Sequence, residues 1–265
     1  MQQERALAGW KVLVTRPKDQ AAGFSAMLRQ LGAKPIELPL ITIAPPFSWE
    51  ELDRCLEVID KYDWIIFASA NAVRSFLQRK DTVAPEADLS TIKIGCVGPA
   101  TVKQLTKAGL KVDFQPSSFI ADAFVAEFPS ARKLSGVKIL WPRTNIGRNL
   151  IADQLTAAGA EVDTALCYQT LGPANPDAAG QTLLDLLTEN QLTSVTFTSA
   201  QTVRNFRELL GEENVDGLLA GVCIAVIGKE TAQAAKQHLN KVDVEAPTST
   251  VEGLIGALIE YAKKS

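Results

Sequence analysis

Histidine is nearly absent from this sequence and cysteine is sparse, which limits the chemistry open to the chain. The one histidine, His238, falls near the end of a helical pattern, where the helix dipole favours a cation. Four cysteines stand alone in apolar patterns, without a CxxC pair: Cys55, Cys96, Cys167 and Cys223. We interpret them as buried thiols, with a reactive role as the alternative. A histidine triad, an HExxH motif and a multi-histidine metal site are excluded, so we expect no bound metal.

Basic clusters, long apolar runs and phosphate-loop motifs are also missing. The 27 Lys and Arg residues are scattered among 30 Asp and Glu, for a formal charge of −3, which argues against a nucleic-acid partner. No run approaches the roughly 18 apolar residues of a membrane span, and Glu4 and Arg5 stand where a signal peptide needs an apolar core. Neither GxGxxG nor a phosphate-loop motif supports a nucleotide ligand. We expect a soluble, cytoplasmic protein without membrane or nucleic-acid partners. Small anions stay open as ligands, because a few placed arginines suffice for them.

What the sequence does contain is a duplication. The segment FASANAVRSF, residues 67–76, returns as FTSAQTVRNF, residues 197–206. In each copy a short apolar run stops at a serine, Ser69 or Ser199, and a helical pattern follows, so both read as strand, N-cap and helix. The first turn of a helix has unpaired N–H groups and partial positive charge, which suit a carboxylate or phosphate. The two copies therefore suggest one anionic ligand shared by two lobes.

Further marks repeat in the same order. The strand patterns KVLVT and KILWP precede helical patterns over residues 19–31 and 147–158, which stop at Gly32 and Gly159. Strand and helix alternate throughout, and the strands are rich in Val and Ile, which is typical of parallel sheets covered by helices on both faces. With 265 residues, 46% of them hydrophobic, we predict two similar α/β lobes. Ligands of such sheets lie at the carboxyl ends of the strands.

Two extended segments, residues 34–46 and 160–173, do not fit the pattern of short loops. Each ends in proline and follows the first strand and helix of its repeat, so we interpret them as crossings between the lobes. The alternative is two lobes in sequence, with a break near Ser135. The predicted organisation is a discontinuous first lobe, a second lobe and two linker strands: 1–38 with 172–265, then 47–164, and 39–46 with 165–171.

Polar residues at the strand ends are the candidates for ligand binding. The turns GPAT and GKET place Thr101 and Thr231 three residues after a glycine, and Ser69 and Ser199 have the same status. Plain strand-to-helix turns are the alternative for all four. Arginines with a planar donor fork follow the first strand of each repeat and could hold a carboxylate, or could be solvated or salt-bridged: Arg16, Arg143 and Arg148. Two further arginines recur within the helices and are expected to pair with neighbours: Arg74 and Arg204.

Tyr168 lies in the second crossing segment. An aromatic residue on a linker strand usually serves packing. If the linkers form the back of a cleft, however, its hydroxyl would face the ligand there. With no histidine available, Tyr168 is the best candidate for a proton donor.

These motifs together resemble one known family. The strings VLVTRP, LGAKPIELPLITI, FASANAVRSF, GPAT, ILWPRTNIGRN, CYQT, FTSAQTV and IGKETA are similar, in order and spacing, to the uroporphyrinogen-III synthase family along essentially the whole chain. The resemblance implies two α/β lobes joined by a two-stranded antiparallel linker, with the substrate in a cleft. By motif it assigns family positions to Thr101, Tyr168, Ser199 and Thr231. Lys229-Glu230 and Val102 depart from the usual pattern, and Glu230 adds a negative charge near an anion site.

The resemblance also implies an activity. It is that of a lyase that cyclises hydroxymethylbilane, a linear tetrapyrrole, to uroporphyrinogen III with loss of water and inversion of ring D, in tetrapyrrole biosynthesis. Such a cleft needs positioning, backbone N–H groups and hydroxyls, and no metal or organic cofactor. We expect a monomer, with room for transient contact with the preceding pathway enzyme. The alternative is a two-lobed, non-catalytic binding protein for a small polyanion.

Overall fold

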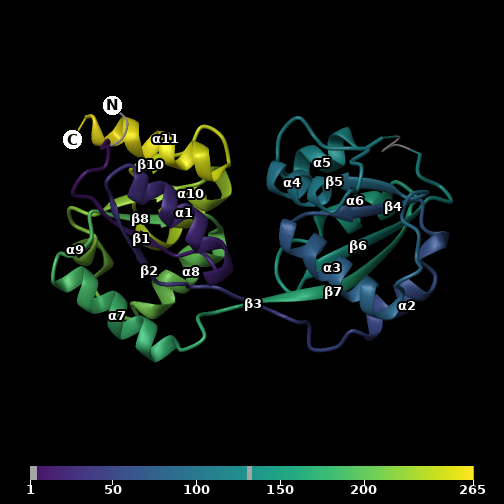
Figure 1. Ribbon diagram of the computed structural model, residues 1–265, viewed down its shortest axis with the longest axis horizontal. Helices are drawn as coiled ribbons and strands as arrows, with labels where there is room; N and C mark the ends of the chain where they lie inside the picture. Colours follow the sequence, from purple (N-terminus) through teal and green to yellow (C-terminus); the bar gives the residue numbers. More distant parts are fainter. Residues whose placement is uncertain (1–4, 130–132, 265) are drawn as a thin grey trace. The chain divides into compact units, whose positions relative to one another are not determined.

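We describe a computed structural model of the chain, which covers residues 5–129 and 133–264 (Figure 1). Contacts divide the chain into two compact units. Unit 1 is formed by residues 1–42 and 171–265, and unit 2 by residues 43–170. In the described part of the chain, no helix is long and apolar enough to span a membrane.

Unit 1 is built on a parallel five-stranded sheet with the order β10-β9-β8-β1-β2. Its strands are β1 (Lys11–Val14), β2 (Lys34–Glu37), β8 (Ser194–Phe197), β9 (Cys223–Val226) and β10 (Val244–Glu245). Its helices are α1 (Lys18–Gln30), α7 (Pro176–Thr188), α8 (Ala200–Leu209), α9 (Val215–Leu218), α10 (Lys229–Leu239) and α11 (Val251–Ala262).

Unit 2 contains a sheet with the order β3-β7-β6-β4-β5, in which β7, β6, β4 and β5 run parallel. Its strands are β3 (Thr42–Ala44), β4 (Trp64–Phe67), β5 (Lys93–Cys96), β6 (Lys138–Thr144) and β7 (Glu161–Leu171). Its helices are α2 (Glu50–Glu57), the 3-10 helix η1 (Ile59–Lys61), α3 (Ala70–Val83), α4 (Pro99–Lys107), α5 (Ala121–Glu127) and α6 (Leu150–Ala157). The two parallel-dominated sheets flanked by helices confirm the predicted fold class.

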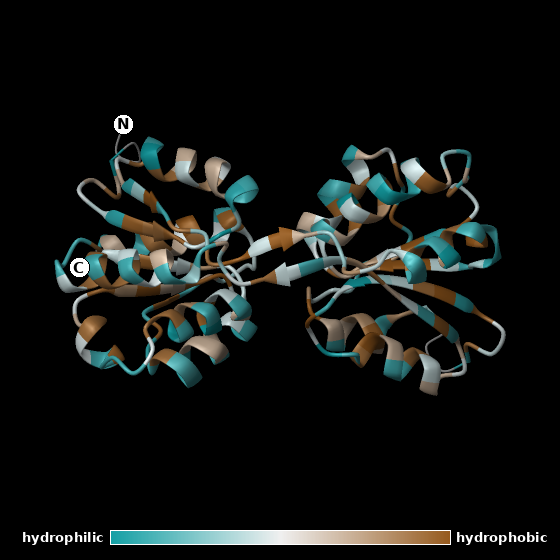
Figure 2. Ribbon diagram, turned by 90° about the horizontal axis from the view of Figure 1, so that it is seen from below, coloured by the Kyte–Doolittle hydropathy of each residue, from teal (hydrophilic) through white to brown (hydrophobic). Residues whose placement is uncertain are grey.

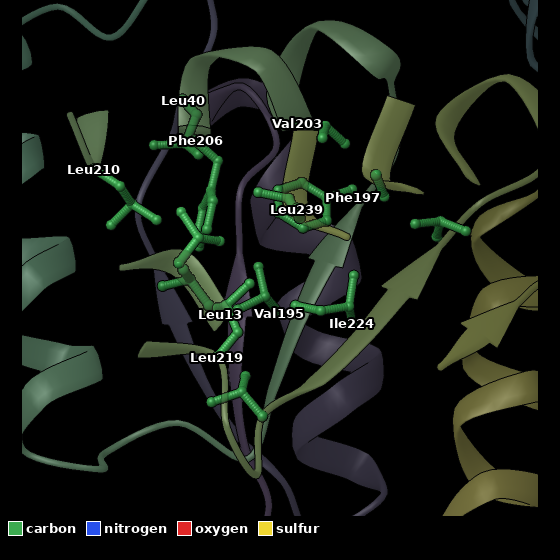
Figure 3. Packing of buried hydrophobic residues seen from close by; sticks show 14 of the residues in the cluster. Leu13, Leu40, Val195, Phe197, Val203, Phe206, Leu210, Leu219, Ile224 and Leu239 are labelled. Atoms are coloured by element: carbon green, nitrogen blue, oxygen red, sulfur yellow. The ribbon is translucent and has the colours of Figure 1, made fainter. Parts of the chain in front are cut away.

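The core of unit 1 follows from side chains that alternate along its strands. Leu13 faces the layer of α7, α8 and α10, whereas its neighbours Val12 and Val14 face the layer of α1 and α11. Figure 3 shows Leu13, Val195 and Ile224 side by side on the first of these faces. Each fully buried side chain of this size stabilises the fold by about 1.5–3 kcal/mol, so both helix layers are held to the sheet.

The sheet of unit 2 is covered in the same way. Ile65 and Phe67 face the layer of α2, α3 and α4, whereas Trp64 and Ile66 face α5 and α6. Figure 2 shows the strands mostly in the brown of hydrophobic residues, while the flanking helices carry hydrophilic patches. A four-residue strand without polar side chains is therefore explained by burial on both faces.

The predicted helix stops hold in both repeats. Gly32 and Gly159 follow the last turns of α1 and α6 with φ of +83° and +99°. This left-handed conformation favours glycine. A Cβ would also come within 3.3 Å of Ala8 Cα at the first and 3.2 Å of Ser135 N at the second.

Two expected boundaries differ in the structure. The helix expected over residues 147–158 begins only at Leu150, because the preceding loop is bonded to Arg143. Residues 165–168, expected within a linker strand, continue the pairing of β7 with β6, and β3 lies next to β7 in the same sheet. The chain passes between the units at residues 42–43 and 170–171.

Candidate active site

The carboxyl-end edge of the unit 2 sheet collects four of the predicted site residues. The strand order β7-β6-β4-β5 places them along this edge in the order Tyr168, Arg143, Ser69 and Thr101. Because parallel strands end together, residues far apart in sequence become neighbours here. Thr101 lies in the first turn of α4 and is buried, 3% exposed.

Ser69 and Tyr168 are in direct contact. Ser69 is the N-cap of α3, and its hydroxyl oxygen accepts a hydrogen bond from Ala72 N–H at 3.1 Å. The same oxygen lies 3.0 Å from the phenolic oxygen of Tyr168, whose side chain is 6% exposed. A helix N-terminus and a buried phenol are thus joined through one serine.

A β-bulge determines on which face of the sheet the Tyr168 side chain lies. Arg143 pairs with Leu166 and the next residue of β6, Thr144, pairs with Tyr168, so Cys167 is the extra residue on β7. Strict alternation would put Cys167 and Tyr168 on opposite faces of the sheet. With the bulge, both side chains join the cluster packed against α2, α3 and α4. The phenol therefore meets the α3 cap.

Burial dominates the titration of this tyrosine. Desolvation raises the pKa of Tyr168, and hydrogen bonding with Ser69 opposes this by favouring the phenolate. The thiol of Cys167 acts in the same direction as burial, and its own pKa is raised to about 12 by desolvation. Tyr168 is therefore a neutral hydrogen-bonding phenol at neutral pH, and Cys167 is an inert buried thiol. All four cysteines are buried, as predicted.

Three further polar residues beside Tyr168 were not expected from the sequence. The hydroxyls of Thr144 and Thr170 lie 3.1 Å apart, and both lower the pKa of Tyr168 against the larger effect of burial. Asn145 Oδ1 accepts from Thr144 Oγ1 at 3.0 Å and from Thr170 N–H at 2.8 Å. Thr144 and Asn145 follow Arg143 directly, and it is the bulge that pairs Thr144 with Tyr168, so the spacing of the sequence did not indicate these residues.

The arginines of this edge bond to their own unit. Arg143 stacks over Trp141, with Cζ 4.7 Å from the ring centroid, and donates to Thr144 O, to Gly147 O and to Asn149 Oδ1. Burial lowers its pKa. Arg148 donates to Asp122 on α5 at 2.8 Å. Both side chains order the loop before α6, and their predicted role as carboxylate ligands stays a prediction.

Unit 1 has a corresponding edge after β1, β8, β9 and β10. Ser199 caps α8 and accepts from Thr202 N–H at 3.2 Å, and its hydroxyl lies 3.3 Å from that of Thr202. Thr231 is buried in the first turn of α10, which is capped by Gly228. A Cβ at Gly228 would lie 2.4 Å from Ser249 Oγ, so glycine admits the close approach of this hydroxyl. Ser249 is thus a residue of this edge that sequence reasoning missed.

Arg16 also lies on the edge of unit 1. Its Nη2 donates to Gln20 Oε1 at 3.2 Å, and its Nε is buried without a hydrogen-bond partner among the described residues. Burial lowers its pKa, while Asp19 and Glu252 act against this. Arg16 is therefore a desolvated cation with an unused donor, the state that suits an anionic ligand.

Arg74 and Arg204 bond within their own helices, as predicted. Arg74 donates to Asn71 Oδ1, and Arg204 donates to Gln201 Oε1 at 3.2 Å. No group of three or more His, Cys, Asp or Glu side chains among the described residues could hold a metal ion.

Comparisons with known proteins agree with this architecture. Residues 22–256 match the family model described as uroporphyrinogen-III synthase HemD. The chain is 37% identical to uroporphyrinogen-III synthase of Synechococcus elongatus, over 99% of both chains. It is 32% identical to that of Chlorobaculum parvum, over 88% of this chain and 91% of the relative. Among solved structures, a mutant uroporphyrinogen III synthase of Thermus thermophilus matches 97% of this chain and 100% of its own length, with a TM-score of 0.69 at 16% identity, and shows the same fold. The protein therefore belongs to the uroporphyrinogen-III synthase family.

Proposed function

We propose that this chain cyclises hydroxymethylbilane to uroporphyrinogen III, with loss of water and inversion of ring D, and that Tyr168 donates a hydrogen bond to the departing hydroxyl. Family membership supplies the reaction. The observation that supports the residue assignment is the buried phenol held 3.0 Å from the Ser69 cap at the carboxyl edge of the unit 2 sheet.

The reaction needs only weak assistance from an acid. Hydroxymethylbilane loses its hydroxyl readily to give an electrophilic azafulvene, and uncatalysed closure yields the isomer without ring inversion. A phenol whose pKa is raised stays protonated and can hydrogen-bond to the leaving oxygen without being consumed. The enzyme's main task is to hold one conformation of the chain, so positioning supplies most of the selectivity.

The substrate's carboxylates match the remaining groups of the two edges. We assign them to the first turns of the helices capped by Ser69 and Ser199, to the turns that hold Thr101 and Thr231, and to Arg16, Arg143 and Arg148. Unpaired N–H groups of a helix start favour carboxylates, and a desolvated arginine gains most from one. A monomeric cytoplasmic enzyme that has transient contact with the preceding pathway enzyme remains our expectation.

A non-catalytic binding protein for a polyanion would use the same edges but would not turn over substrate. The test is to follow hydroxymethylbilane consumption and to separate isomers I and III by chromatography, with spontaneous closure measured in a no-enzyme control. The wild-type chain should yield isomer III well above background.

Tyr168→Phe then tests the role of the phenol. We expect turnover to fall roughly ten- to a hundredfold, about 1.4–2.7 kcal/mol, with isomer III still dominant. Tyr62→Phe is the matched control, because Tyr62 is also buried and bonds Asp163 at 2.6 Å, but precedes β4 at the other end of the sheet. A background rate and only isomer I from Tyr168→Phe would make Tyr168 an essential acid. Absence of isomer III from the wild type would favour the binding protein.

A further inference from the structure

The loop before α5 exposes two adjacent apolar side chains. Phe119 is 41% exposed and Ile120 is 43% exposed. Phe114 pairs with Gly95 of β5 in a parallel bridge, so the chain beyond it leaves the sheet at the carboxyl-end edge, where Thr101 lies. This apolar pair, Phe119 and Ile120, is therefore at the edge of the unit 2 sheet where ligands of such sheets bind.

Ile120 is also an unfavourable residue for its position. It is the N-cap of α5, and isoleucine has no side-chain oxygen that could accept a hydrogen bond from the helix. The offset of 130 residues between Gly98 and Gly228 gives Thr250 as its counterpart in unit 1, where the threonine caps α11 by accepting from Gly253 N–H at 2.9 Å. Unit 2 thus lacks a cap bond and has an exposed apolar side chain instead. Departures of this kind from a local rule are expected mainly at functional sites.

The loop that carries the pair is anchored at its start. Ser117 donates through its N–H and its hydroxyl to the carboxylate of Glu127, at 2.8 and 2.6 Å, which ties the loop to the end of α5. The same offset pairs Phe119 with Ser249 and Glu127 with Ala257, so unit 1 has neither the apolar side chain nor the anchoring carboxylate at these positions. The apolar pair is therefore held by hydrogen bonds that are specific to unit 2.

The residues beside the pair indicate what would cover it. Arg148, which we assign to a substrate carboxylate, donates to Asp122 at 2.8 Å, and Asp122 lies in the first turn of α5, two residues after Ile120. An apolar surface close to an arginine matches a pyrrole ring that carries carboxylate side chains. The other groups assigned to the substrate at the two edges bind carboxylates or the departing hydroxyl, and none of them contacts a ring face.

We propose that Phe119 and Ile120 contact a pyrrole ring of the linear tetrapyrrole, and that unit 2 has isoleucine at the α5 N-cap for this contact although it lowers the stability of the helix. This inference rests on the proposed function for the identity of the ligand. The buried apolar area is the same for substrate and product, so the contact acts on affinity and has little effect on kcat.

The test exchanges the pair, one residue at a time, for the residues of unit 1. Ile120→Thr should raise the melting temperature by roughly 2–4 °C, because threonine can supply the missing cap bond. The same change should raise KM for hydroxymethylbilane and the dissociation constant of uroporphyrinogen III roughly three- to tenfold, with little change in kcat. A purely structural role of Ile120 predicts no such combination of higher stability and weaker binding. Ile120→Ser gives the same signs and serves if the threonine variant does not fold.

Phe119→Ser should weaken binding by a similar factor, whereas Phe119→Leu should retain most of the affinity. Val83→Thr is the matched control, because Val83 is 38% exposed but is the last residue of α3, which runs away from the carboxyl-end edge. It should leave KM unchanged. Thr250→Ile tests the cap in the opposite direction and should lower the melting temperature, since it removes the bond from Gly253 N–H. Product affinity is measured by titration calorimetry with uroporphyrinogen III under exclusion of oxygen.

The outcomes separate this contact from the proposed function. If Ile120→Thr and Phe119→Ser leave KM and the product dissociation constant at their wild-type values, the ring contact is refuted while the formation of isomer III stands. If Ile120→Thr lowers the melting temperature, isoleucine is at the cap for stability and the proposal is wrong. If both variants bind the product more weakly but the wild type forms no isomer III, the contact is supported and the catalytic function is refuted.

Discussion

The two copies of the strand-cap-helix motif are built alike but contact different groups. Ser69 and Ser199 both accept a hydrogen bond from the N–H three residues on. Ser199 then meets Thr202 of its own helix, whereas Ser69 meets the phenol of Tyr168 on β7. The duplication thus kept the helix start that suits an anion in both units. In unit 2 that start lies 3.0 Å from a phenol on a strand, whereas in unit 1 the neighbouring Thr202 hydroxyl donates back to Ser199 O within the helix start.

The segments that contain Leu40 in unit 1 and Tyr168 in unit 2 show the same difference. In unit 1, Asn205 on α8 donates to Leu40 O at 2.6 Å, a buried bond between side chain and backbone. The offset of 127 residues between Gly32 and Gly159 places Ile41, a buried apolar side chain, at the position of Tyr168. Each segment is therefore bonded to the helix of the repeated motif: Leu40 to α8 through its backbone carbonyl, and Tyr168 to the N-cap of α3 through a pair of hydroxyls.

The largest expected effect concerns the pair of packed phenylalanines that each unit contains. Phe67 packs on Phe76 with ring centroids 5.4 Å apart, and Phe197 packs on Phe206 at 5.2 Å. Phe76→Ala and Phe206→Ala should each lower the free energy of unfolding by about 3–5 kcal/mol, because both rings are fully buried. Native-state hydrogen exchange should assign each loss to its own unit, with Phe47→Ala, 85% exposed, as a near-neutral control. A loss spread equally over both units would mean that they unfold together.

Alkaline pH should lower the stability of unit 2 more than that of unit 1. Burial raises the pKa of Cys96 and Cys223 to about 11 and that of Cys167 to about 12, and it also raises the pKa of Cys55. A thiol whose folded pKa is raised stays protonated while the unfolded chain ionises. Its contribution to stability is thus complete below the unfolded pKa, about 8.5, and is lost above it by about 1.4 kcal/mol per pH unit.

Unit 2 holds three of these thiols and unit 1 holds only Cys223. Hydrogen exchange at pH 8 to 10 should therefore show the free energy of opening falling more steeply in unit 2. Cys96→Ala should make the decrease of the opening free energy of unit 2 with pH less steep, by about the contribution of one thiol. Equal slopes in the two units would contradict this account.

Regular features of the fold could be predicted because each depends on a local rule. Gly32 and Gly159 mark helix ends through left-handed φ, and Ser69 and Ser199 mark helix starts through their side-chain oxygens. Apolar four-residue strands between helices indicated sheets covered on both faces. Because of the repeat, each of these patterns occurs twice in the sequence, which strengthens the prediction made from it.

The setting of Tyr168 could not be predicted, because one bulge changes the period of β7. Alternation along the strand says nothing of where an extra residue enters, and here it enters at Cys167. The delayed start of α6 has a similar cause. Arg143 has donors that bond the loop before the helix, and helix propensity cannot anticipate that competition.

The smallest effect concerns the two caps themselves. Ser69→Ala and Ser199→Ala should each lower the free energy of unfolding by about 1 kcal/mol, and the glycine variants by only a few tenths, since glycine is itself a tolerated N-cap. Thermal unfolding followed by hydrogen exchange would measure these losses, with Asn175→Ala at the cap of α7 as a control of the same chemistry. The share of the loss that comes from the cap bond should match between the units, because the cap bonds match, and Ser69→Ala additionally loses the hydrogen bond with Tyr168.

The chemical consequence should not match. Ser69→Gly removes the hydroxyl that faces Tyr168 but keeps a residue that is tolerated as an N-cap, so a raised pKa of Tyr168 in this variant reports the lost contact and not a loosened helix. Ser199→Gly loses the same hydroxyl beside Thr202, and it should leave the pKa of Tyr168 unchanged, as measured in both variants by fluorine NMR on protein labelled with 3-fluorotyrosine. If both glycine variants raised the pKa alike, the phenol would be responding to helix starts in general, and the difference between Ser69 and Ser199 would have no chemical meaning.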